Sequence, residues 1–193
     1  MKTIKFLLFI SLITWANISA AQMIFNNPSF EDEPSDATVP MGWFPCEIGT
    51  TPDIGPGPWG IDLEAEEGET YVGLITRSDG SFEAIGQRFP EVLEVDACYE
   101  FKLSASACDT YSGFNERIKF RVWGSTKRLR RTQLLYESEI VDNTDWKEHK
   151  VEFTAEKKLK YLIIEAYIDY DQGPRKGHVL LDNITNIRQC SKV

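Results

Sequence analysis

Apolar and polar residues alternate along most of this chain. From residue 22 onward, short segments with a period of two, rich in Val, Ile, Tyr and Phe, are separated by Gly, Asp, Asn and Pro. This alternation is typical of half-buried strands, because successive strand residues point to opposite faces of a sheet. We therefore predict strands near residues 23–30, 69–77, 82–89, 97–107, 116–124, 133–141, 146–155, 160–169 and 178–188.

The pattern predicts an all-β fold, because no segment shows convincing helical periodicity over three turns. About nine strands in residues 22–193 fit one domain, a single-domain antiparallel β-sandwich with jelly-roll topology. A hydrophobic content of 42% and an aromatic content of 12% exclude a disordered chain.

Residues 31–69 interrupt the alternation with a long stretch rich in Gly and Pro. Long loops in compact domains are usually functional or disordered. The presence of Trp43, Cys46 and Trp59 predicts that this loop is anchored to the domain.

The first 21 residues have the pattern of a secretory signal peptide. Lys2 and Lys5 precede the apolar segment 6–15, and small residues at 19–21 form a cleavage site. That segment is shorter than the roughly 20 apolar residues that span a bilayer. We expect a secreted protein, extracellular or periplasmic, without membrane insertion.

The charge balance narrows the range of partners. The chain has 21 Lys+Arg against 30 Asp+Glu, a formal net charge of −9. Nucleic acid and anionic membranes bind basic surfaces, so neither is an expected partner. The one basic cluster, residues 127–131, is interpreted as a solvated hairpin tip, and the alternative is a polyanion site.

Four cysteines lie in the exported part, where disulfides persist. Cys98 and Cys108 bracket one predicted strand, which holds them too far apart to bond and leaves two pairing schemes. One joins Cys98 to Cys190 and Cys46 to Cys108, and the other joins Cys46 to Cys98 and Cys108 to Cys190. We expect the first, because Cys98 begins a central strand and Cys190 ends the last one.

Motifs for catalysis are largely missing from the sequence. It contains no G-x-S-x-G, HExxH, P-loop or GxGxxG motif, and His149 and His178 lie in strand-like segments. A hydrolase with a pair of carboxylates, as in glycoside hydrolases, is the alternative, because acidic residues are abundant. Since the catalytic motifs above are missing, we expect a non-catalytic protein.

One predicted sheet face combines aromatic and charged side chains. Along two strands, the residues that point away from the core are Lys119, Arg121, Trp123, Glu165 and Tyr167. Saccharide sites use flat rings to stack on sugars and charged groups to bind hydroxyls. The alternative is that Trp123 and Tyr167 pack beneath a loop.

Motifs at both ends of the predicted domain carry a family resemblance. The first is NPSFE at residues 27–31 and the last is LLDNI at residues 180–184. Between them lie GWFPC at 42–46, GETYVGL at 68–74, IGQRF at 85–89 and CYEF at 98–101. In their order and spacing, these motifs resemble the carbohydrate-binding-module-like, galactose-binding-like jelly-roll domains of secreted Bacteroidota proteins.

The resemblance implies a structural Ca²⁺ ion that joins the first and last motifs. Its ligands here are the side chains of Glu31 and Asp182 with backbone oxygens near Ser29 and Gly68. Ca²⁺ takes six to eight hard oxygen ligands, which agrees with this set. The alternative is that Glu31 is exposed and Asp182 caps a turn.

The resemblance also implies a non-catalytic saccharide-binding function. The site is predicted either on the sheet face described above or on the loop at Trp43 and Trp59, and the partner is a glycan or a cell-envelope component. We expect a monomer. The rival functions are a protein-interaction or envelope domain without a sugar ligand, and a hydrolase with an acid pair.

Overall fold

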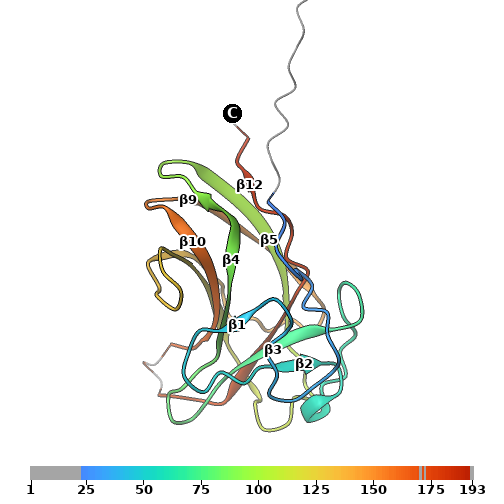
Figure 1. The fold of residues 1–193 in the computed structure, drawn as a ribbon. Coiled ribbons are helices and arrows are strands. Elements are labelled where there is room, and N and C mark those ends of the chain that lie inside the picture. The colour runs from blue at the N-terminus through green and yellow to red at the C-terminus, as the bar shows by residue number, and fades with distance from the viewer. Residues whose placement is uncertain (1–22, 170, 172, 192–193) are drawn as a thin grey trace, which may run out of the picture.

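A computed structural model describes residues 23–169, 171 and 173–191 as a β-sandwich (Figure 1). One sheet has five strands, in the spatial order β1 (Phe44–Pro45), β4 (Ala84–Leu93), β10 (Leu159–Tyr167), β7 (Lys119–Ser125) and β8 (Gln133–Glu137). The second sheet is built from β2 (Asp53–Gly55), β3 (Tyr71–Thr76), β11 (Gly177–Asp182), β5 (Cys98–Ser106) and β9 (Lys147–Thr154), with the short β6 (Glu116–Arg117) and β12 (Arg188–Gln189).

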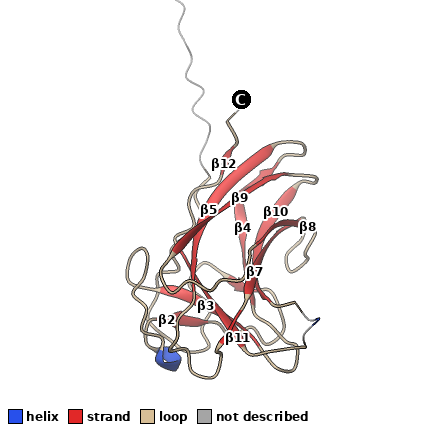
Figure 2. Ribbon diagram, turned by 180° about the vertical axis from the view of Figure 1, so that it is seen from behind, coloured by secondary structure: helices blue, strands red, loops and turns tan. Residues whose placement is uncertain are grey.

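All strand pairs are antiparallel except β6 with β11. Strands far apart in sequence lie side by side, since β4 pairs with β10 and β11 lies between β3 and β5. The two layers are seen from behind in Figure 2. The prediction of an all-β antiparallel sandwich is confirmed.

The core lies between the two sheets, where the alternating apolar residues meet. Phe120 of β7, Leu162 of β10, Leu103 of β5 and Val179 of β11 are all fully buried there. The predicted inward faces of β5, β7 and β10 are therefore confirmed, and their other residues form the outer faces of the sandwich.

Several predicted strands differ from the structure. The predicted strand 116–124 is divided at Ile118 between β6 and β7, which belong to different sheets, and the predicted strand 133–141 ends as β8 at Glu137. Residues 23–30 make only one bridge, from Met23 to Ile187, because Asn27 and Phe30 adopt left-handed backbone conformations. The predicted strand 178–188 is interrupted at Asn183, which has a φ of 49°. The long loop also contains β1, β2 and the 3-10 turn η1 (Pro58–Gly60), which are too short to show alternation.

The disulfide Cys98–Cys190 is present, as expected, with the two Cα atoms 5.3 Å apart. The prediction of a Cys46–Cys108 bond is wrong, because both cysteines are buried and unpaired. Cys46 packs outside the five-stranded sheet with Ala84 and Ile163, whereas Cys108 packs in a separate apolar cluster outside the other sheet. The whole sandwich separates the two thiols.

The predicted signal peptide, residues 1–21, lies outside the described residues. Within the described part of the chain, none of the helices has the length and apolar character needed to cross a membrane.

Candidate functional site

The outer face of the five-stranded sheet brings together the five residues that the sequence placed there. β7 and β10 are paired so that Tyr167 lies opposite Lys119, Glu165 opposite Arg121, and Ile163 opposite Trp123. Side chains directly opposite on antiparallel strands lie within about 5.5 Å at their Cβ atoms. The result is one continuous polar and aromatic surface.

The aromatic rings on this face are held by charged neighbours. Trp123 Nε1 donates a hydrogen bond of 2.9 Å to Glu165 Oε1. The Arg121 guanidinium carbon lies 3.2 Å from the centre of the Tyr167 ring, and the Tyr167 hydroxyl donates to Asp169 at 2.7 Å. Trp123 and Tyr167 both stay partly exposed, although Trp123 packs against the apolar cluster that contains Cys46 of the long loop.

Ion pairs fix the other charged groups on the same face. Lys119 Nζ lies 3.2 Å from Glu137 Oε1 and 3.2 Å from Asp169 Oδ2. Arg121 Nε lies 2.7 Å from Glu137 Oε2. Hydrogen bonds to Asp169 and Glu137 raise the pKa of Lys119, which keeps that amine protonated at neutral pH.

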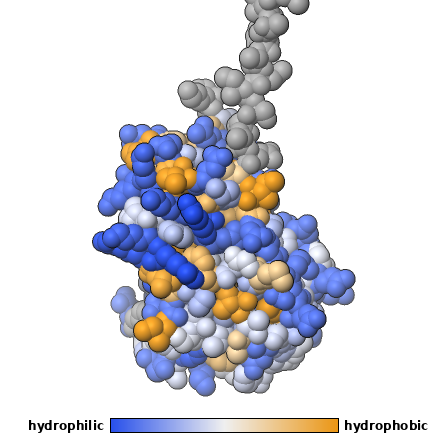
Figure 3. All heavy atoms as spheres, in the orientation of Figure 1, coloured by the Kyte–Doolittle hydropathy of each residue, from blue (hydrophilic) through white to orange (hydrophobic). Residues whose placement is uncertain are grey.

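The β7–β8 loop folds back over one end of the face. Arg131 forms ion pairs with Glu165 and, at 3.2 Å, with Glu47. The interpretation of residues 127–131 as a solvated tip is therefore wrong for Arg131, while the other four residues are exposed. In Figure 3, strongly hydrophilic side chains cross the face that carries β1 and β4, with hydrophobic side chains beside them.

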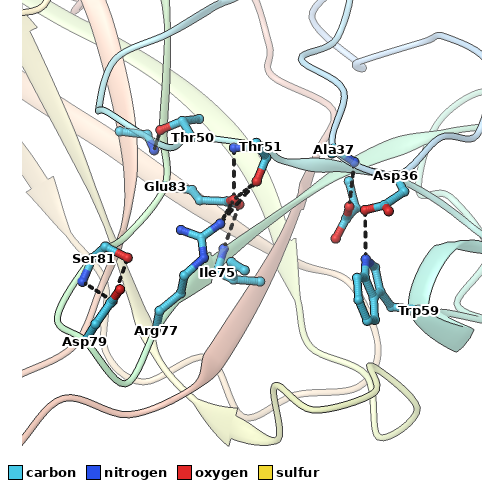
Figure 4. A network of polar contacts seen from close by, with 12 residues as sticks. Asp36, Ala37, Thr50, Thr51, Trp59, Ile75, Arg77, Asp79, Ser81 and Glu83 are labelled. Carbon is cyan, nitrogen blue, oxygen red and sulfur yellow. Dashed lines mark hydrogen bonds and ion pairs between the residues drawn. The ribbon is translucent and has the colours of Figure 1, made fainter.

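The two tryptophans predicted for the loop site have opposite environments. Trp43 is 8% exposed, packs on Phe30 with ring centres 4.9 Å apart, and donates to the Asn27 carbonyl. Its ring has no free face, so we leave it out of the site. Trp59 is 49% exposed, and its indole N–H donates to Asp36 Oδ1 at 2.9 Å (Figure 4).

Asp36 and Asp53 form a carboxyl pair beside Trp59. Asp53 accepts hydrogen bonds from the Tyr111 hydroxyl and the Ala37 amide. Burial raises the pKa of Asp53 to about 6.

Two other buried polar side chains, Glu83 and His178, have structural partners. Glu83 forms a 2.5 Å ion pair with Arg77 and accepts hydrogen bonds from Thr51 and the Ile75 amide, which ties the long loop to β3 (Figure 4). His178 Nε2 accepts from the Cys108 amide. Burial lowers the pKa of His178 to about 4, so the imidazole is neutral.

The four residues predicted to bind calcium converge at the turn formed by residues 66–70. Glu31 accepts hydrogen bonds from the Glu69 and Thr70 amides, and Asp182 accepts from Glu66 and Glu67 at 2.8 and 3.0 Å. Gly68 has a φ of 73°, and a Cβ there would lie 2.1 Å from Glu31 Oε1. Ser29 Oγ donates a hydrogen bond to the carboxylate of Glu67, a residue that was not among the predicted calcium ligands.

This cluster concentrates negative charge. Asp182 is fully buried, and burial raises its pKa to about 7, with the Glu31 charge adding to the effect. Across the described residues, no ion pair joins a lysine or arginine to Glu31, Glu67 or Asp182. Among the described residues, the side-chain ligand atoms that lie within 4.8 Å of one another are those of Cys98, Glu152 and Cys190, and the two sulfurs form the disulfide.

Comparisons with known proteins show the fold. No family model and no curated protein matches the sequence. Among solved structures, the CBM22-1 xylan-binding domain of Paenibacillus barcinonensis Xyn10C is 16% identical with a TM-score of 0.56, over 91% of this chain and 99% of that one. TmCBM61, solved with β-1,4-galactotriose, is 14% identical with a TM-score of 0.53, over 88% and 100%.

Two further structural neighbours have other roles. The K2 cleaved adhesin domain of Lys-gingipain is 13% identical with a TM-score of 0.53, over 90% of this chain and 99% of that one. The arabinose-bound MgGH51 α-L-arabinofuranosidase is 13% identical with a TM-score of 0.59, and the match covers 90% of this chain but 27% of the enzyme. This chain therefore has the β-sandwich fold of carbohydrate-binding modules and adhesin domains.

Proposed function

We propose that this chain is a secreted, non-catalytic binding module whose saccharide ligand lies on the outer face of the five-stranded sheet. The observation that carries the proposal is the joint placement of Arg121, Trp123 and Tyr167, partly exposed and side by side, on a fold shared with carbohydrate-binding modules. The Cys98–Cys190 disulfide agrees with an extracellular location.

The chemistry of this face suits a saccharide. Partly exposed rings offer apolar area for the C–H face of a sugar, and Trp123 is pre-oriented by its hydrogen bond to Glu165. Acidic and basic groups at Glu137, Asp169 and Lys119 supply acceptors and donors for hydroxyl groups. Because ion pairs already hold these side chains, little conformational entropy is lost on binding.

Trp59 is the second candidate site, and its exposure favours it. Its indole is fixed at both ends, by the hydrogen bond to Asp36 and by an edge contact with Phe114 at 6.3 Å between ring centres. A fixed, exposed indole is a suitable platform for a single sugar ring.

Binding to immobilised xylan and β-1,4-galactan tests the proposal and separates the two sites. We expect Trp123→Ala and Tyr167→Ala each to weaken binding about tenfold, which corresponds to the loss of one stacking contact. Trp59→Ala would carry the loss if the loop is the site. Trp146→Phe, which changes a ring on the other sheet, is the matched control.

A failure to bind any polysaccharide would contradict the proposal. If none of a broad set of polysaccharides binds the folded protein, the saccharide function is wrong. The favoured alternative is then a protein-interaction domain, which the similarity to adhesin domains supports.

The proposal includes a structural calcium ion held by Glu31 and Asp182. What supports the ion is the chemistry of the donors around one turn: the Glu31, Glu67 and Asp182 carboxylates and the Ser29 hydroxyl are hard oxygen ligands, and no ion pair among the described residues gives these acids a basic partner. The ion would join the first motif of the domain to the end of β11. It would also offset the cost of burying Asp182 in its charged form.

Thermal unfolding with and without a chelator tests the calcium site. A ligand that binds only the folded state stabilises it by about 2.7 kcal/mol at a hundredfold excess over its Kd. We expect chelation to lower the Tm of the wild type and to leave the Tm of Glu31→Ala unchanged. Glu33→Ala, an exposed acid two residues away, is the control. Identical wild-type curves with calcium and with chelator would remove the ion from the proposal.

A further inference from the structure

A cluster of cations without acid partners lies at one corner of the outer face. Arg88 projects from β4, and Lys127, Arg128 and Arg130 project from the β7–β8 loop, all exposed. None of the ion pairs among the described residues includes these four side chains. In a chain with nine more acids than bases, unpaired positive charge at one corner is unexpected.

The elements around this corner place two aromatic rings between the cations. Arg88 lies directly opposite Tyr161, where β4 pairs with β10. Tyr161 meets Phe44 of β1 edge to face, with ring centres 6.2 Å apart. The Arg128 guanidinium then lies 4.3 Å from the centre of the Phe44 ring. The order across the surface is therefore Arg88, Tyr161, Phe44, Arg128.

The corner differs from the rest of the outer face in its available charge. Lys119, Arg121 and Arg131 already pair with acids there, so they offer little net charge to a ligand. Arg88 and Arg128 take part in none of the ion pairs found within residues 23–169, 171 and 173–191. Phe44 and Tyr161 are partly exposed, so ring surface and positive charge are both accessible at one place.

We propose that this corner, formed by Phe44, Arg88, Arg128 and Tyr161, binds an anionic polysaccharide. The rings would contact the sugar, and the guanidinium groups would pair with a carboxylate of a uronic acid or with a sulfate ester. Guanidinium binds both anions through two parallel hydrogen bonds, so it suits either source. The inference rests on the saccharide-binding function proposed above and adds the ligand class and the residues that select it.

The geometry explains why the ligand is a saccharide and not a general polyanion. A site for nucleic acid uses an extended basic surface that follows many phosphates, whereas this corner has four cations in a protein with a net charge of −9. The acidic remainder of the surface would repel a densely charged polymer. A polysaccharide with spaced charges and apolar ring faces meets less repulsion.

Binding of the purified protein to polygalacturonate, dextran sulfate, neutral xylan and duplex DNA tests the inference. We expect the anionic polysaccharides to bind at least tenfold more tightly than xylan at low salt, and their affinity to fall as salt is added. Polygalacturonate and dextran sulfate distinguish carboxylate from sulfate as the preferred anion.

Two double variants with equal charge change identify the residues. Arg88→Ala/Arg128→Ala removes two cations from the corner, and Lys147→Ala/Lys176→Ala removes two exposed cations near the other sheet. A hydrogen bond to a charged group is worth about tenfold or more in affinity. We expect a loss of about a hundredfold for the first variant on the anionic ligand and less than threefold for the second.

The ring contribution is measured separately. Tyr161→Ala should weaken binding to the anionic polysaccharide, and Tyr161→Phe should retain most of it, because the ring is kept. Near-ultraviolet circular dichroism of each variant checks that the fold is intact.

Three outcomes would overturn the inference. If neutral xylan binds and the arginine variant binds it as well as the wild type does, with no preference for anionic ligands, the general saccharide function stands and this site is wrong. Equal binding of duplex DNA and anionic polysaccharide would indicate a non-selective cationic patch. If no polysaccharide binds at all, both proposals are wrong.

Discussion

Three tryptophans have different roles at the scale of single residues. Trp43 and Trp59 lie in the same irregular stretch of the sequence, whereas Trp123 lies on a predicted strand. The structure buries the first, exposes the second and fixes the third to Glu165. Their local sequence carries no signal of this, because burial depends on segments distant along the chain, such as Asn27 and Phe30 for Trp43.

Stability measurements should separate these roles. We expect Trp43→Ala to lower the free energy of unfolding by about 3–5 kcal/mol, because it leaves a cavity and an unpaired Asn27 carbonyl. Trp59→Ala should cost less than about 1 kcal/mol, because the ring is half exposed. Urea denaturation of both variants gives the values, and equal losses would contradict the assignment of Trp43 to the core.

Gly86 lies where the long loop contacts the five-stranded sheet. A Cβ at this position would lie 2.5 Å from Cys46 Sγ and 2.8 Å from the Leu162 carbonyl oxygen. Because the Leu162 oxygen is a backbone atom, a Cβ at residue 86 would fit only if β10 or the loop moved. We expect Gly86→Ala to cost about 1–3 kcal/mol by overpacking. Gly49→Ala, which has open space around its Cβ position but a φ of 78°, is the comparison that measures backbone strain without overpacking. Unchanged stability of the Gly86 variant would contradict the close contact.

Asp182 should make stability depend on pH. Its folded pKa, about 7, lies above its unfolded value, so the folded state holds the proton more tightly between about pH 4 and 7. The resulting stabilisation is present at low pH and is lost as pH rises toward 7. His178, with a folded pKa of about 4, contributes in the opposite direction, so the comparison must isolate Asp182.

Asp182→Asn provides that comparison. We expect the wild type in chelator to lose stability relative to Asp182→Asn as pH rises from 5 to 7.5, as measured by Tm at each pH. Added calcium should reduce the difference, because a cation favours the carboxylate. Parallel Tm curves for the two proteins across this range would show that Asp182 does not titrate with folding.

At the scale of elements, the long strands were predictable and the short ones were not. β5, β7 and β10 have seven to nine residues, which is enough for alternation to show which side faces the core. β1 and β2 have two or three residues and exist because β4 and β3 offer partners. The sequence 23–30 alternates as a strand would, but the left-handed residues Asn27 and Phe30 turn it into a loop.

The cysteines also show that long strands were predictable and irregular segments were not. Cys98 and Cys190 could be paired from the sequence because each lies at the end of a recognisable strand. Cys108 follows the end of β5, where the chain leaves the sheet, and its amide bonds to His178 on β11. No alternation predicts that exit, so the expected partner of Cys46 was wrong.

Thiol chemistry should confirm the cysteine assignment. In denaturant without reductant, we expect two thiols per chain to react with iodoacetamide, at Cys46 and Cys108, and four after reduction. Burial raises the pKa of Cys46 to about 12, so this thiol should be unreactive in the native protein at pH 8. Peptide mapping that found Cys46 in a disulfide would contradict the structure.

At the scale of the whole molecule, the sequence predicted which side chains share a sheet face but not which contacts they form. The period of two placed Lys119, Arg121, Trp123, Glu165 and Tyr167 on one face. It could not show that Arg131 returns to Glu165, or that Arg128 reaches Phe44. Those contacts depend on the path of the β7–β8 loop and of residues 44–47, which only the assembled sandwich defines.

Unfolding should be cooperative, because both sheets contribute to one core. Phe101 and Leu103 from one sheet and Phe120 and Leu162 from the other belong to the same buried cluster. Neither sheet can keep its inner face buried without the other, so no half of the sandwich is stable alone. We expect one thermal transition, with coincident curves from far- and near-ultraviolet circular dichroism and an enthalpy of roughly 0.7 kcal/mol per residue.

Removal of the disulfide by mutation tests the same prediction of cooperative unfolding. Cys98 and Cys190 are 92 residues apart in sequence, and closing a loop of this size stabilises a fold by about 4 kcal/mol in the chain-entropy model. We expect the Cys98→Ser/Cys190→Ser variant to melt at a lower temperature but still in one transition, since the shared core is intact. Two separate transitions in the variant would mean that the disulfide, and not the core, couples the two sheets.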